Sequence, residues 1–219
     1  MKYAYSQNER VEATPKAQGI CICCGSEMIA KCGNQKIWHW AHKSRRQCDT
    51  WWENETEWHR TWKDKFPKKW QEVVHFSDDG EKHIADVKTR NGFVIEFQHS
   101  AISPSEMASR EQFYTNMIWI VDGTRLLKDL QRFTSSEHWQ FYQSDRYDHA
   151  NLGALPKRWI NSSVPVFFDF GIDDWLYELI HQYDPEAGNG PVSVTMKIDY
   201  LVHAITNSGA WQAQRVKLK

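Results

Sequence analysis

The spacing of apolar residues predicts two helices in the first half of the chain. Trp58, Trp62 and Phe66 recur every four positions and Pro67 ends the run, so we expect a helix over about residues 51–66. Ser103-Pro104-Ser105-Glu106 has the form of a helix-capping box with proline at the first helical position, which predicts a second helix to about Asn116.

Runs of β-branched and aromatic residues predict several strands around these helices. We expect strands at 71–77, 82–89 and 93–99, a short buried strand at 117–121, further strands at 164–170 and 192–198, and a helix at 173–183. Residues 15–50 show neither period and are expected to be rich in loops. Helices and strands in this order predict an α/β fold, with helices packed on a mixed sheet.

Composition and charge limit the class of protein. The chain has 219 residues, 41% of them hydrophobic and 25% charged, which is enough apolar material for a core. No stretch approaches the roughly 20 apolar residues of a membrane helix, and the start of the chain lacks the apolar run of a signal peptide. We therefore expect a soluble, cytoplasmic protein without a membrane partner.

The chain divides by composition into three parts, which we expect to be domains or modules at 1–50, 51–125 and 126–219. Residues 1–70 hold 13 Lys and Arg against 8 Asp and Glu, whereas the remainder holds 14 against 20. A basic front half is typical of a protein that meets a polyanion, although a solvated basic face gives the same count.

All five cysteines lie in the first 48 residues, and their odd number favours a metal site over disulfides. Cys21 and Cys24 form a C-x2-C pair, and His39 and His42 form an H-x2-H pair. Zn²⁺ prefers thiolate and imidazole ligands in a closed tetrahedron, so we predict a structural zinc site made of these four residues. Three residues are alternatives for one of the histidines: Cys23, Cys32 and Cys48. Chance spacing of ordinary buried cysteines is the other interpretation.

Two acids on neighbouring predicted strands indicate a second site. Asp86 lies in Ile-Ala-Asp-Val-Lys, and Glu96 lies in Val-Ile-Glu-Phe-Gln, followed two positions later by Gln98. This is the arrangement of a metal-dependent phosphodiesterase of the PD-(D/E)xK type, in which Mg²⁺ or Mn²⁺ takes oxygen ligands from one or two carboxylates and from the phosphate. A hairpin with solvent-facing acids is the alternative.

The turn between the two strands decides whether the acids can meet. A two-residue turn at Asn91-Gly92 would place Asp86 opposite Phe97, with the acids on different faces. A three-residue loop, with Gly92 left-handed, would place Asp86 opposite Glu96. We predict the three-residue loop.

Helical spacing adds further candidates. Glu55, His59 and Lys63 are four residues apart and share one stripe of the predicted helix, from which a third acid and basic groups would reach the same metal. Arg110 and Tyr114 share a face of the second helix. We predict that Lys63, Arg110 and Tyr114 contact nucleic acid; a salt-bridged surface helix and plain packing are the alternatives.

Together these motifs resemble the competence protein CoiA family, also described as CoiA-like nucleases. The matching pieces are Cys21-x2-Cys24 with His39-Trp-Ala-His42, Glu55-x3-His59-x3-Lys63, His83-Ile-Ala-Asp86, Glu96-Phe-Gln98-His-Ser, Arg110-x3-Tyr114 and Trp119-Ile-Val-Asp122. The resemblance implies a zinc-ribbon-like N-terminal module, a restriction-endonuclease-like core and a role in DNA processing. It would make Asp86 and Glu96 metal ligands, put Gln98 at the usual lysine position, and make Glu55 and His59 the helix contribution.

The sequence therefore favours a Mg²⁺- or Mn²⁺-dependent nuclease that acts on DNA, whether branched, single-stranded or duplex. A zinc-stabilised DNA-binding or adaptor protein without turnover is the second hypothesis, because Gln98 carries no charge and cannot act as a base. A zinc hydrolase that uses the cysteine–histidine segment is the third. Monomer and homodimer are both compatible with the sequence.

Overall fold

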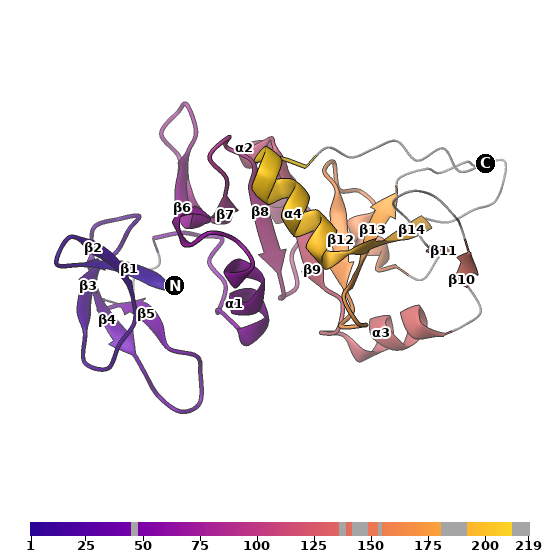
Figure 1. Cartoon of the computed structure of the whole chain (residues 1–219). Helices are drawn as coiled ribbons and strands as arrows, with labels where there is room; N and C mark the ends of the chain where they lie inside the picture. The colour runs from indigo at the N-terminus through magenta and orange to yellow at the C-terminus, as the bar shows by residue number, and fades with distance from the viewer. Residues whose placement is uncertain (45–47, 136–138, 142–148, 153–154, 181–191, 212–219) are drawn as a thin grey trace. The chain divides into compact units, whose positions relative to one another are not determined.

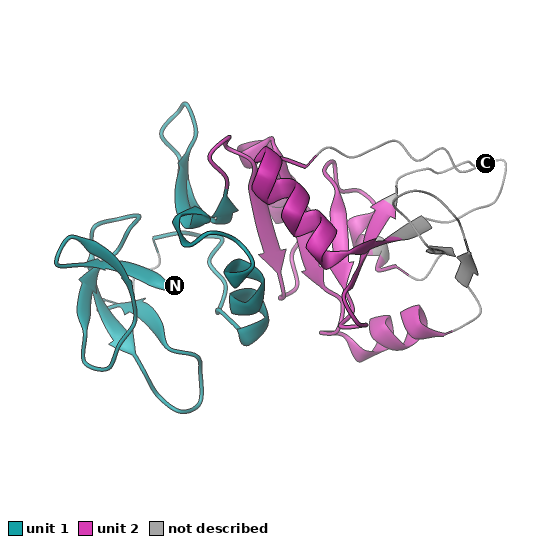
Figure 2. Ribbon diagram, viewed as in Figure 1, with its two compact units in different colours: residues 1–88 teal, residues 89–219 magenta. Residues whose placement is uncertain are grey.

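The computed structural model contains two compact units, residues 1–88 and 89–219 (Figures 1 and 2). It describes residues 1–44, 48–135, 139–141, 149–152, 155–180 and 192–211. The predicted division of the chain at residues 50 and 125 stays a prediction.

The first unit begins with a five-stranded antiparallel sheet in the order β2-β1-β3-β4-β5. Its strands are β1 (Tyr3–Ser6), β2 (Glu9–Glu12), β3 (Gln18–Ile20), β4 (Glu27–Lys31) and β5 (His39–His42). Met28 and Trp40 are buried in a small core with several of the cysteines. The part expected to be rich in loops thus contains three of these strands.

The second part of the first unit contains α1 (Glu57–Asp64), the 3-10 turn η1 (Lys68–Trp70), and the antiparallel strands β6 (Gln71–Phe76) and β7 (Lys82–Lys88). The predicted helix exists but begins at Glu57, not at Trp51. Thr56 caps it: its side chain accepts a hydrogen bond from the backbone N–H of His59, and the His59 ring accepts one from the backbone N–H of Thr56.

The second unit is a mixed sheet with helices, as predicted. Its strand order is β10-β11-β14-β13-β12-β9-β8, in which β8, β9 and β12 are parallel and β12, β13 and β14 are antiparallel. Every residue of β8 and β9 is buried, as is typical of parallel strands that are covered on both faces. The strands are β8 (Val94–Gln98), β9 (Met117–Asp122), β10 (Trp139–Phe141), β11 (His149–Leu152), β12 (Val166–Asp169), β13 (Trp175–Ile180) and β14 (Val192–Lys197).

Among the described residues, the helices of this unit are α2 (Pro104–Tyr114), α3 (Leu127–Thr134) and α4 (Ile198–Ser208), with a 3-10 turn, η3, at Lys157–Trp159. The Ser103 half of the predicted capping box of α2 is confirmed, because the Ser103 hydroxyl accepts a hydrogen bond from the Glu106 N–H, whereas the Glu106 carboxylate pairs with Arg110. No helix in the described part of the chain has the length and apolar character that a membrane crossing requires.

The predicted helix at 173–183 is wrong over its described part. Trp175–Ile180 is the strand β13, paired with β14 along its length and with β12 on its other edge. Leu176, Glu178 and Leu179 are all buried, so both faces are covered and the alternation of a half-exposed strand is absent. Residues 181–183 lie outside the described residues.

Helix α4 was not predicted, although the sequence holds its signals. Ile198, Leu201 and Ile205 are spaced as one buried helical stripe, and all three are buried. Gly209 ends the helix in the left-handed conformation, with φ of 75°.

The turn before β8 has the predicted three-residue form. The Gly92 N–H donates to the Thr89 carbonyl oxygen at 3.0 Å, and the Thr89 N–H donates to the Phe93 carbonyl oxygen at 2.9 Å. Gly92 has φ of 80°, which is the left-handed residue of a G1 bulge. Thr89 therefore stands opposite Phe93.

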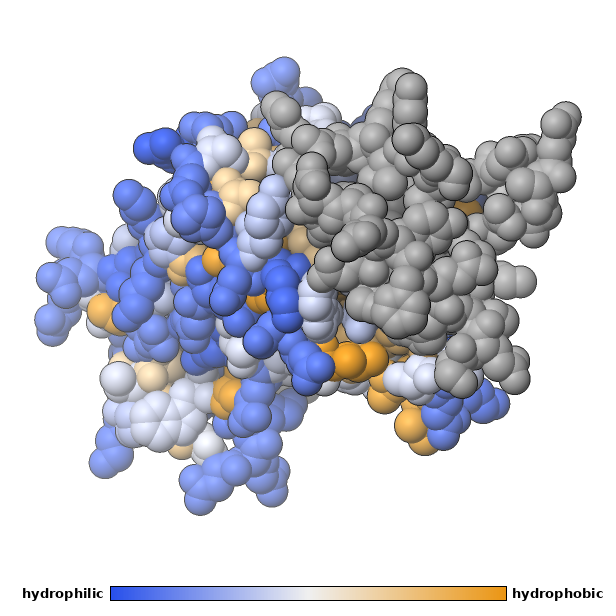
Figure 3. Space-filling model, turned by 45° about the vertical axis from the view of Figure 1, so that its right-hand side comes forward, coloured by the Kyte–Doolittle hydropathy of each residue, from blue (hydrophilic) through white to orange (hydrophobic). Residues whose placement is uncertain are grey.

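The face of the molecule drawn in Figure 3 is mostly hydrophilic over the described residues, with separate apolar spots. Leu127 and Phe76 are the most exposed large apolar side chains of the described residues. Single exposed apolar residues are normal on a protein surface, so neither marks an interface by itself.

The turn gives a test of the register. We expect Gly92→Ala to lower the free energy of unfolding by about 1 kcal/mol, because a Cβ disfavours the left-handed conformation. Gly33→Ala is the matched control, since a Cβ at Gly33 meets nothing within 4 Å and its φ is not positive. Urea unfolding of both variants measures the difference; equal stability of the two would contradict the turn.

Candidate functional site

Four possible metal ligands gather in the first unit. Cys21, Cys24, His42 and Cys48 each offer one ligand atom, and these atoms lie within 4.8 Å of one another. The turn after β3 carries the first two residues, β5 ends with His42, and Cys48 follows β5. The Cys21 and Cys48 sulfurs are 3.6 Å apart, and the Cys24 sulfur is 3.4 Å from Nε2 of His42.

His39 is not part of this cluster, which corrects the predicted ligand set. His39 and His42 are three positions apart on strand β5, and side chains an odd number apart on a strand point to opposite faces. The Nδ1 of His39 is instead 2.8 Å from the carbonyl oxygen of Ile37. Cys48, one of the open alternatives, takes the fourth position.

The cluster fits zinc by ligand type and by spacing. Zinc–sulfur bonds of about 2.3 Å in a tetrahedron separate two sulfurs by about 3.8 Å, close to the distance between Cys21 and Cys48. Three thiolates with one imidazole form a set that is common in structural zinc sites and leaves no open position for a substrate. The segment could thus bind Zn²⁺ through these four residues.

The thiols of the cluster differ in acidity. Burial raises the pKa of Cys24, but hydrogen bonds with Ser26 and His42 outweigh it and lower that pKa to about 6. Burial and the neighbouring Cys21 raise the pKa of Cys48. Without a cation, crowded thiolates repel one another, and a divalent ion would remove that penalty.

A buried lysine lies among three acidic side chains of the first unit. Lys63, on α1, is 3% exposed, and its Nζ lies 2.8 Å from Oε1 of Glu55 and 2.9 Å from Oε1 of Glu72. Burial alone would lower the pKa of Lys63, but Glu72, Glu55 and Asp86 outweigh this effect and raise it. The charge of Lys63 therefore persists inside the unit.

Glu72 is a member of this cluster that the sequence analysis missed. Its carboxylate also accepts hydrogen bonds from the backbone N–H of Lys2 at 2.7 Å and of Tyr3 at 2.9 Å. Burial raises the pKa of Glu72, but Lys63 and these N–H groups lower it to about 2. The partners of Glu72 at the start of the chain are about 70 positions away, so local spacing gave no signal.

Asp86 lies at the edge of the same cluster. Its Oδ1 is 3.9 Å from Nζ of Lys63, and its side chain is 24% exposed, the most open of the carboxylates around the lysine. Glu55 is more enclosed: burial raises its pKa, but Lys63 outweighs this and lowers it. Glu55 also pairs with Arg60, at 3.0 Å. The predicted meeting of Glu55 and Lys63 is therefore present.

His59 takes part in the cap at the start of α1. Its ring Nδ1 is 2.9 Å from the Thr56 hydroxyl oxygen, as part of the helix cap, and its Nε2 is 3.7 Å from Glu53. The side chain is buried. In this arrangement His59 fixes the segment that carries Glu55.

In the second unit, Glu96 and Gln98 point from β8 into a buried environment. Nη1 of Arg110 lies 3.3 Å from Oε2 of Glu96, and Nη2 of the same guanidinium pairs with Glu106. Gln98 donates from Nε2 to the Ser100 carbonyl oxygen at 3.1 Å. The predicted burial of Glu96 is present, and Arg110 is its charged partner.

The three residues predicted to contact nucleic acid are buried. Lys63, Arg110 and Tyr114 are 3%, 4% and 2% exposed. Lys63 and Arg110 neutralise carboxylates within their own units, and Tyr114 packs edge-on against Phe113. In this structure they lie in the protein interior and offer no surface to a nucleic acid. The prediction failed because helical spacing shows which residues share a face but not whether that face points inward.

The sheet of the second unit carries another polar pair that was not predicted as a site. His99 Nδ1 lies 2.7 Å from Oδ2 of Asp122, just after β8 and at the end of β9, and Thr124 donates to the other carboxylate oxygen. Parallel strands bring their carboxyl ends to one edge, which explains this meeting.

The comparisons with known proteins agree with these features. Residues 4–50 match the family model described as the N-terminal domain of competence protein CoiA, and residues 55–158 match its nuclease-like domain. The chain belongs to the competence protein CoiA family. This CoiA-family chain is 28% identical over 156 residues to competence protein CoiA of Bacillus subtilis (strain 168), an alignment that covers 64% of the chain and 41% of that relative. No solved structure matches the chain.

The family assignment gives the chain a nuclease-like domain, and the fold is a mixed α/β fold. Both family models match segments in the predicted order, with the cysteine–histidine cluster inside the first and Glu55 at the start of the second. The alignment spans less than half of the Bacillus subtilis relative.

The ligand set of the zinc cluster is tested by metal analysis. We expect purified protein to retain one zinc per chain, Cys48→Ser to lose most of it because a thiolate ligand is missing, and His39→Ala to retain it. Cys32→Ser is the matched control, since Cys32 lies outside the cluster. Loss of zinc from His39→Ala together with its retention by Cys48→Ser would instead support the set predicted from the sequence, in which His39 is a ligand and Cys48 is not.

The low pKa of Glu72 predicts how stability depends on pH. A carboxyl with a folded pKa of about 2 and an ordinary value of 4.5 stabilises the protein fully above pH 4.5, and this contribution disappears as pH falls towards 2. We expect Glu72→Gln to cost about 2 kcal/mol at pH 7 and to flatten the loss of stability on acidification.

Urea unfolding at several pH values between 7 and 3 measures this effect. Glu27→Gln is the control, because the side chain of Glu27 is exposed and its partner Lys43 is exposed as well. An acid-induced loss of stability that is as steep in Glu72→Gln as in the unchanged protein would contradict the assignment.

Proposed function

We propose that this chain is a Mg²⁺- or Mn²⁺-dependent nuclease that hydrolyses phosphodiester bonds of DNA. Asp86 and Glu96 would hold the ion, and Glu55 would act through a water molecule or a second ion. Gln98 would orient the water or the phosphate. His59, whose ring closes the cap of α1, would hold Glu55 in place as a positioning residue.

The turn at Thr89–Phe93 is the observation that carries the proposal. Thr89 stands opposite Phe93 through the two hydrogen bonds that close the turn. A hairpin that continued with this register in both directions would put Asp86 opposite Glu96, with both side chains on one face. The proposal requires this pairing, and a two-residue turn would have removed it.

The donor atoms suit a hard divalent cation. Carboxylate oxygens are the ligands that Mg²⁺ and Mn²⁺ prefer, and one or two of them suffice when substrate phosphate and water complete the shell. When bound, the ion lowers the pKa of a coordinated water and neutralises charge on the attacked phosphate. The amide of Gln98 can donate a hydrogen bond to water or phosphate, but it cannot remove a proton, so slow cleavage is expected.

Basic side chains next to the acids support a second candidate, a DNA-binding or adaptor protein without turnover. Lys63 lies within 3.9 Å of Asp86, and Arg110 lies 3.3 Å from Glu96. Each proposed ligand thus already has a counter-charge in its own unit, and such a charge can stabilise a carboxylate that no longer binds metal. In the nuclease, the ion competes with these partners, and a high metal requirement follows.

DNA is the proposed partner in both candidates. The relative's name connects that protein with competence, and we propose a related role here in DNA processing, be it recombination, transformation or defence. Residues 1–70 hold 13 Lys and Arg against 8 Asp and Glu, a balance that favours contact with phosphates.

A substrate panel tests the nuclease. Zinc-loaded protein is incubated with single-stranded, duplex and branched DNA, with Mg²⁺ or Mn²⁺ and with no added divalent ion. We expect cutting only with the added ion, and a loss of at least about 100-fold in Asp86→Ala and in Glu96→Ala, because each removes a metal ligand. Asp78→Ala, in the exposed loop between β6 and β7, is the matched control and keeps activity.

Two results separate the candidates. Binding of DNA by Asp86→Ala, measured by anisotropy, stays unchanged if the carboxylate serves only the metal. DNA binding without cutting under any ion, in the unchanged protein, would exclude the nuclease and leave the adaptor.

A further inference from the structure

A pocket lies beside the cysteine–histidine cluster in the first unit. Its volume is about 190 Å³, and it is bordered by β5, by the segment after Cys48 and by Ile84 of β7. Met28, Trp40, Trp52 and Ile84 supply apolar walls, and His39 and Asp49 are among its polar residues. The metal cluster explains His42 and Cys48, but neither it nor the proposed nuclease uses this space.

The two tryptophans that line the pocket differ in exposure. Trp40 is 1% exposed and belongs to the core of the N-terminal sheet, whereas Trp52 is 40% exposed. The Trp40 indole N–H is already bonded to the Val11 carbonyl oxygen at 3.0 Å, so this ring is held in place. Trp52 lines the pocket and is partly open to solvent, which suits a flat ligand that can stack on its indole.

The polar groups of the pocket are not equally available. Asp49 already accepts hydrogen bonds from Ile84 N–H, from Trp51 N–H and from His83. In the neutral His39 ring, Nδ1 carries the proton because it faces the Ile37 carbonyl oxygen, which only accepts. Nε2 of His39 then carries a lone pair and can accept a hydrogen bond from a ligand. His39 borders the pocket from the face of β5 opposite to that of Trp40 and His42.

Size and shape select an aromatic ring as the occupant. An apolar cavity of about 150 Å³ is enough for one benzene molecule. The 190 Å³ of this pocket therefore suit a heteroaromatic ring that carries donor groups. Nucleobases are such rings: they stack on exposed indoles and donate from ring or exocyclic nitrogens.

We infer that this pocket binds one unstacked nucleobase of a single-stranded nucleic acid, stacked on Trp52 and hydrogen-bonded to Nε2 of His39. The basic balance of residues 1–70 favours a polyanionic strand over a neutral or cationic ligand. The site gives the N-terminal module a recognition role besides metal binding. This inference does not depend on the nuclease proposal, because base binding needs neither Asp86 nor a catalytic ion.

Anisotropy with labelled oligonucleotides tests the site. Zinc-loaded protein is titrated, without Mg²⁺ or Mn²⁺, with a single-stranded deoxycytidine hexamer and with a hexamer of the same backbone that lacks the bases. We expect Trp52→Ala to weaken binding of the hexamer on the order of 10-fold and to leave binding of the base-free strand unchanged, since only stacking is lost. His39→Phe weakens hexamer binding too, because the acceptor is gone.

Trp38→Ala is the matched control. Trp38 is 46% exposed, close to Trp52 in exposure and in sequence, but it does not line this pocket. We expect this variant to bind the hexamer as the unchanged protein does. Zinc content and circular dichroism check that each variant folds; if Trp52→Ala does not, His39→Phe carries the test.

Three results would overturn the inference. Equal binding of the hexamer and the base-free strand would mean that only the backbone is held. Equal losses in Trp38→Ala and Trp52→Ala would remove the pocket from recognition. A cytidine mononucleotide that binds as tightly as the hexamer would make the pocket a free-nucleotide site. Since Asp86→Ala leaves hexamer binding unchanged if the inference holds, failure of the nuclease and failure of this site are separate outcomes.

Discussion

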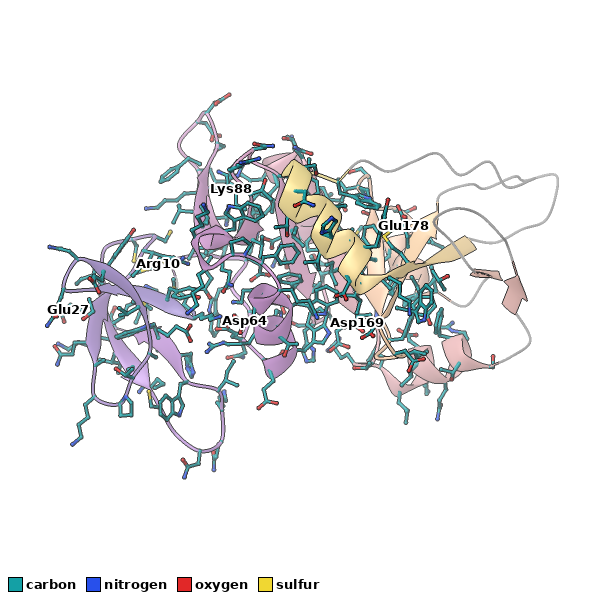
Figure 4. All side chains as sticks on the ribbon, in the orientation of Figure 1. Arg10, Glu27, Asp64, Lys88, Asp169 and Glu178 are labelled. Carbon is teal, nitrogen blue, oxygen red and sulfur yellow. The ribbon has the colours of Figure 1, made fainter. Side chains whose placement is uncertain are left out.

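A single buried carboxylate, that of Glu72, joins the parts of the first unit. It accepts hydrogen bonds from the backbone N–H of Lys2 and of Tyr3, where β1 begins, and pairs with the ammonium of Lys63 on α1, while Glu72 itself is the second residue of β6. Burying a carboxylate is costly unless its lone pairs are filled, and three donors fill them here. Lys2 adds an ion pair with Asp64, labelled in Figure 4, at the end of α1. The start of the chain is therefore fixed by charge as well as by packing.

Neutralisation of buried carboxylates also explains why basic residues that were predicted to contact nucleic acid lie in the interior. Lys63 neutralises Glu55 and Glu72 and approaches Asp86, and Arg110 does the same for Glu96 and Glu106. A cluster of acids without such partners would shift its pKa values upward and lose charge. Among these acids, Lys63 lowers the pKa of Glu55 and of Glu72 despite their burial, so both carboxylates are favoured in the charged form. The same basic residues would compete with any cation for the carboxylates that they contact.

Local signals in the sequence predicted local structure well. The Ser103 cap, the left-handed Gly92 and the C-x2-C turn each depend on residues within a few positions, and each is present. Glu55 and Lys63 also meet, but Glu55 precedes the cap of α1 and does not lie on the predicted helical stripe. The mixed α/β fold and its nuclease-like domain follow from the order of these elements and from the family match.

Failures arose where a partner is distant in sequence or where both faces are covered. An H-x2-H pair fits one face of a turn, but on strand β5 it splits across two faces, so Cys48 replaces His39. Strand β13 is buried on both sides and has no alternation to distinguish it from a helix. Glu72 gave no signal, because its donors come from Lys2 and Tyr3. In each case tertiary contacts determine the structure, and the spacing of residues in the sequence does not predict them.

The segment after the metal cluster connects the two candidate sites of the first unit. Cys48 is a cluster member, and the next residue, Asp49, accepts hydrogen bonds from Ile84 N–H and His83 on β7, at 2.7 Å each. Trp51 stacks on His83 with ring centroids 3.3 Å apart, which holds the same strand. Asp86 lies two residues beyond Ile84 and points to the same side of β7. The chain that follows the cluster is thus fastened to β7 at Ile84 and His83, so the cysteine–histidine cluster and the strand that carries Asp86 belong to one hydrogen-bonded part of the first unit.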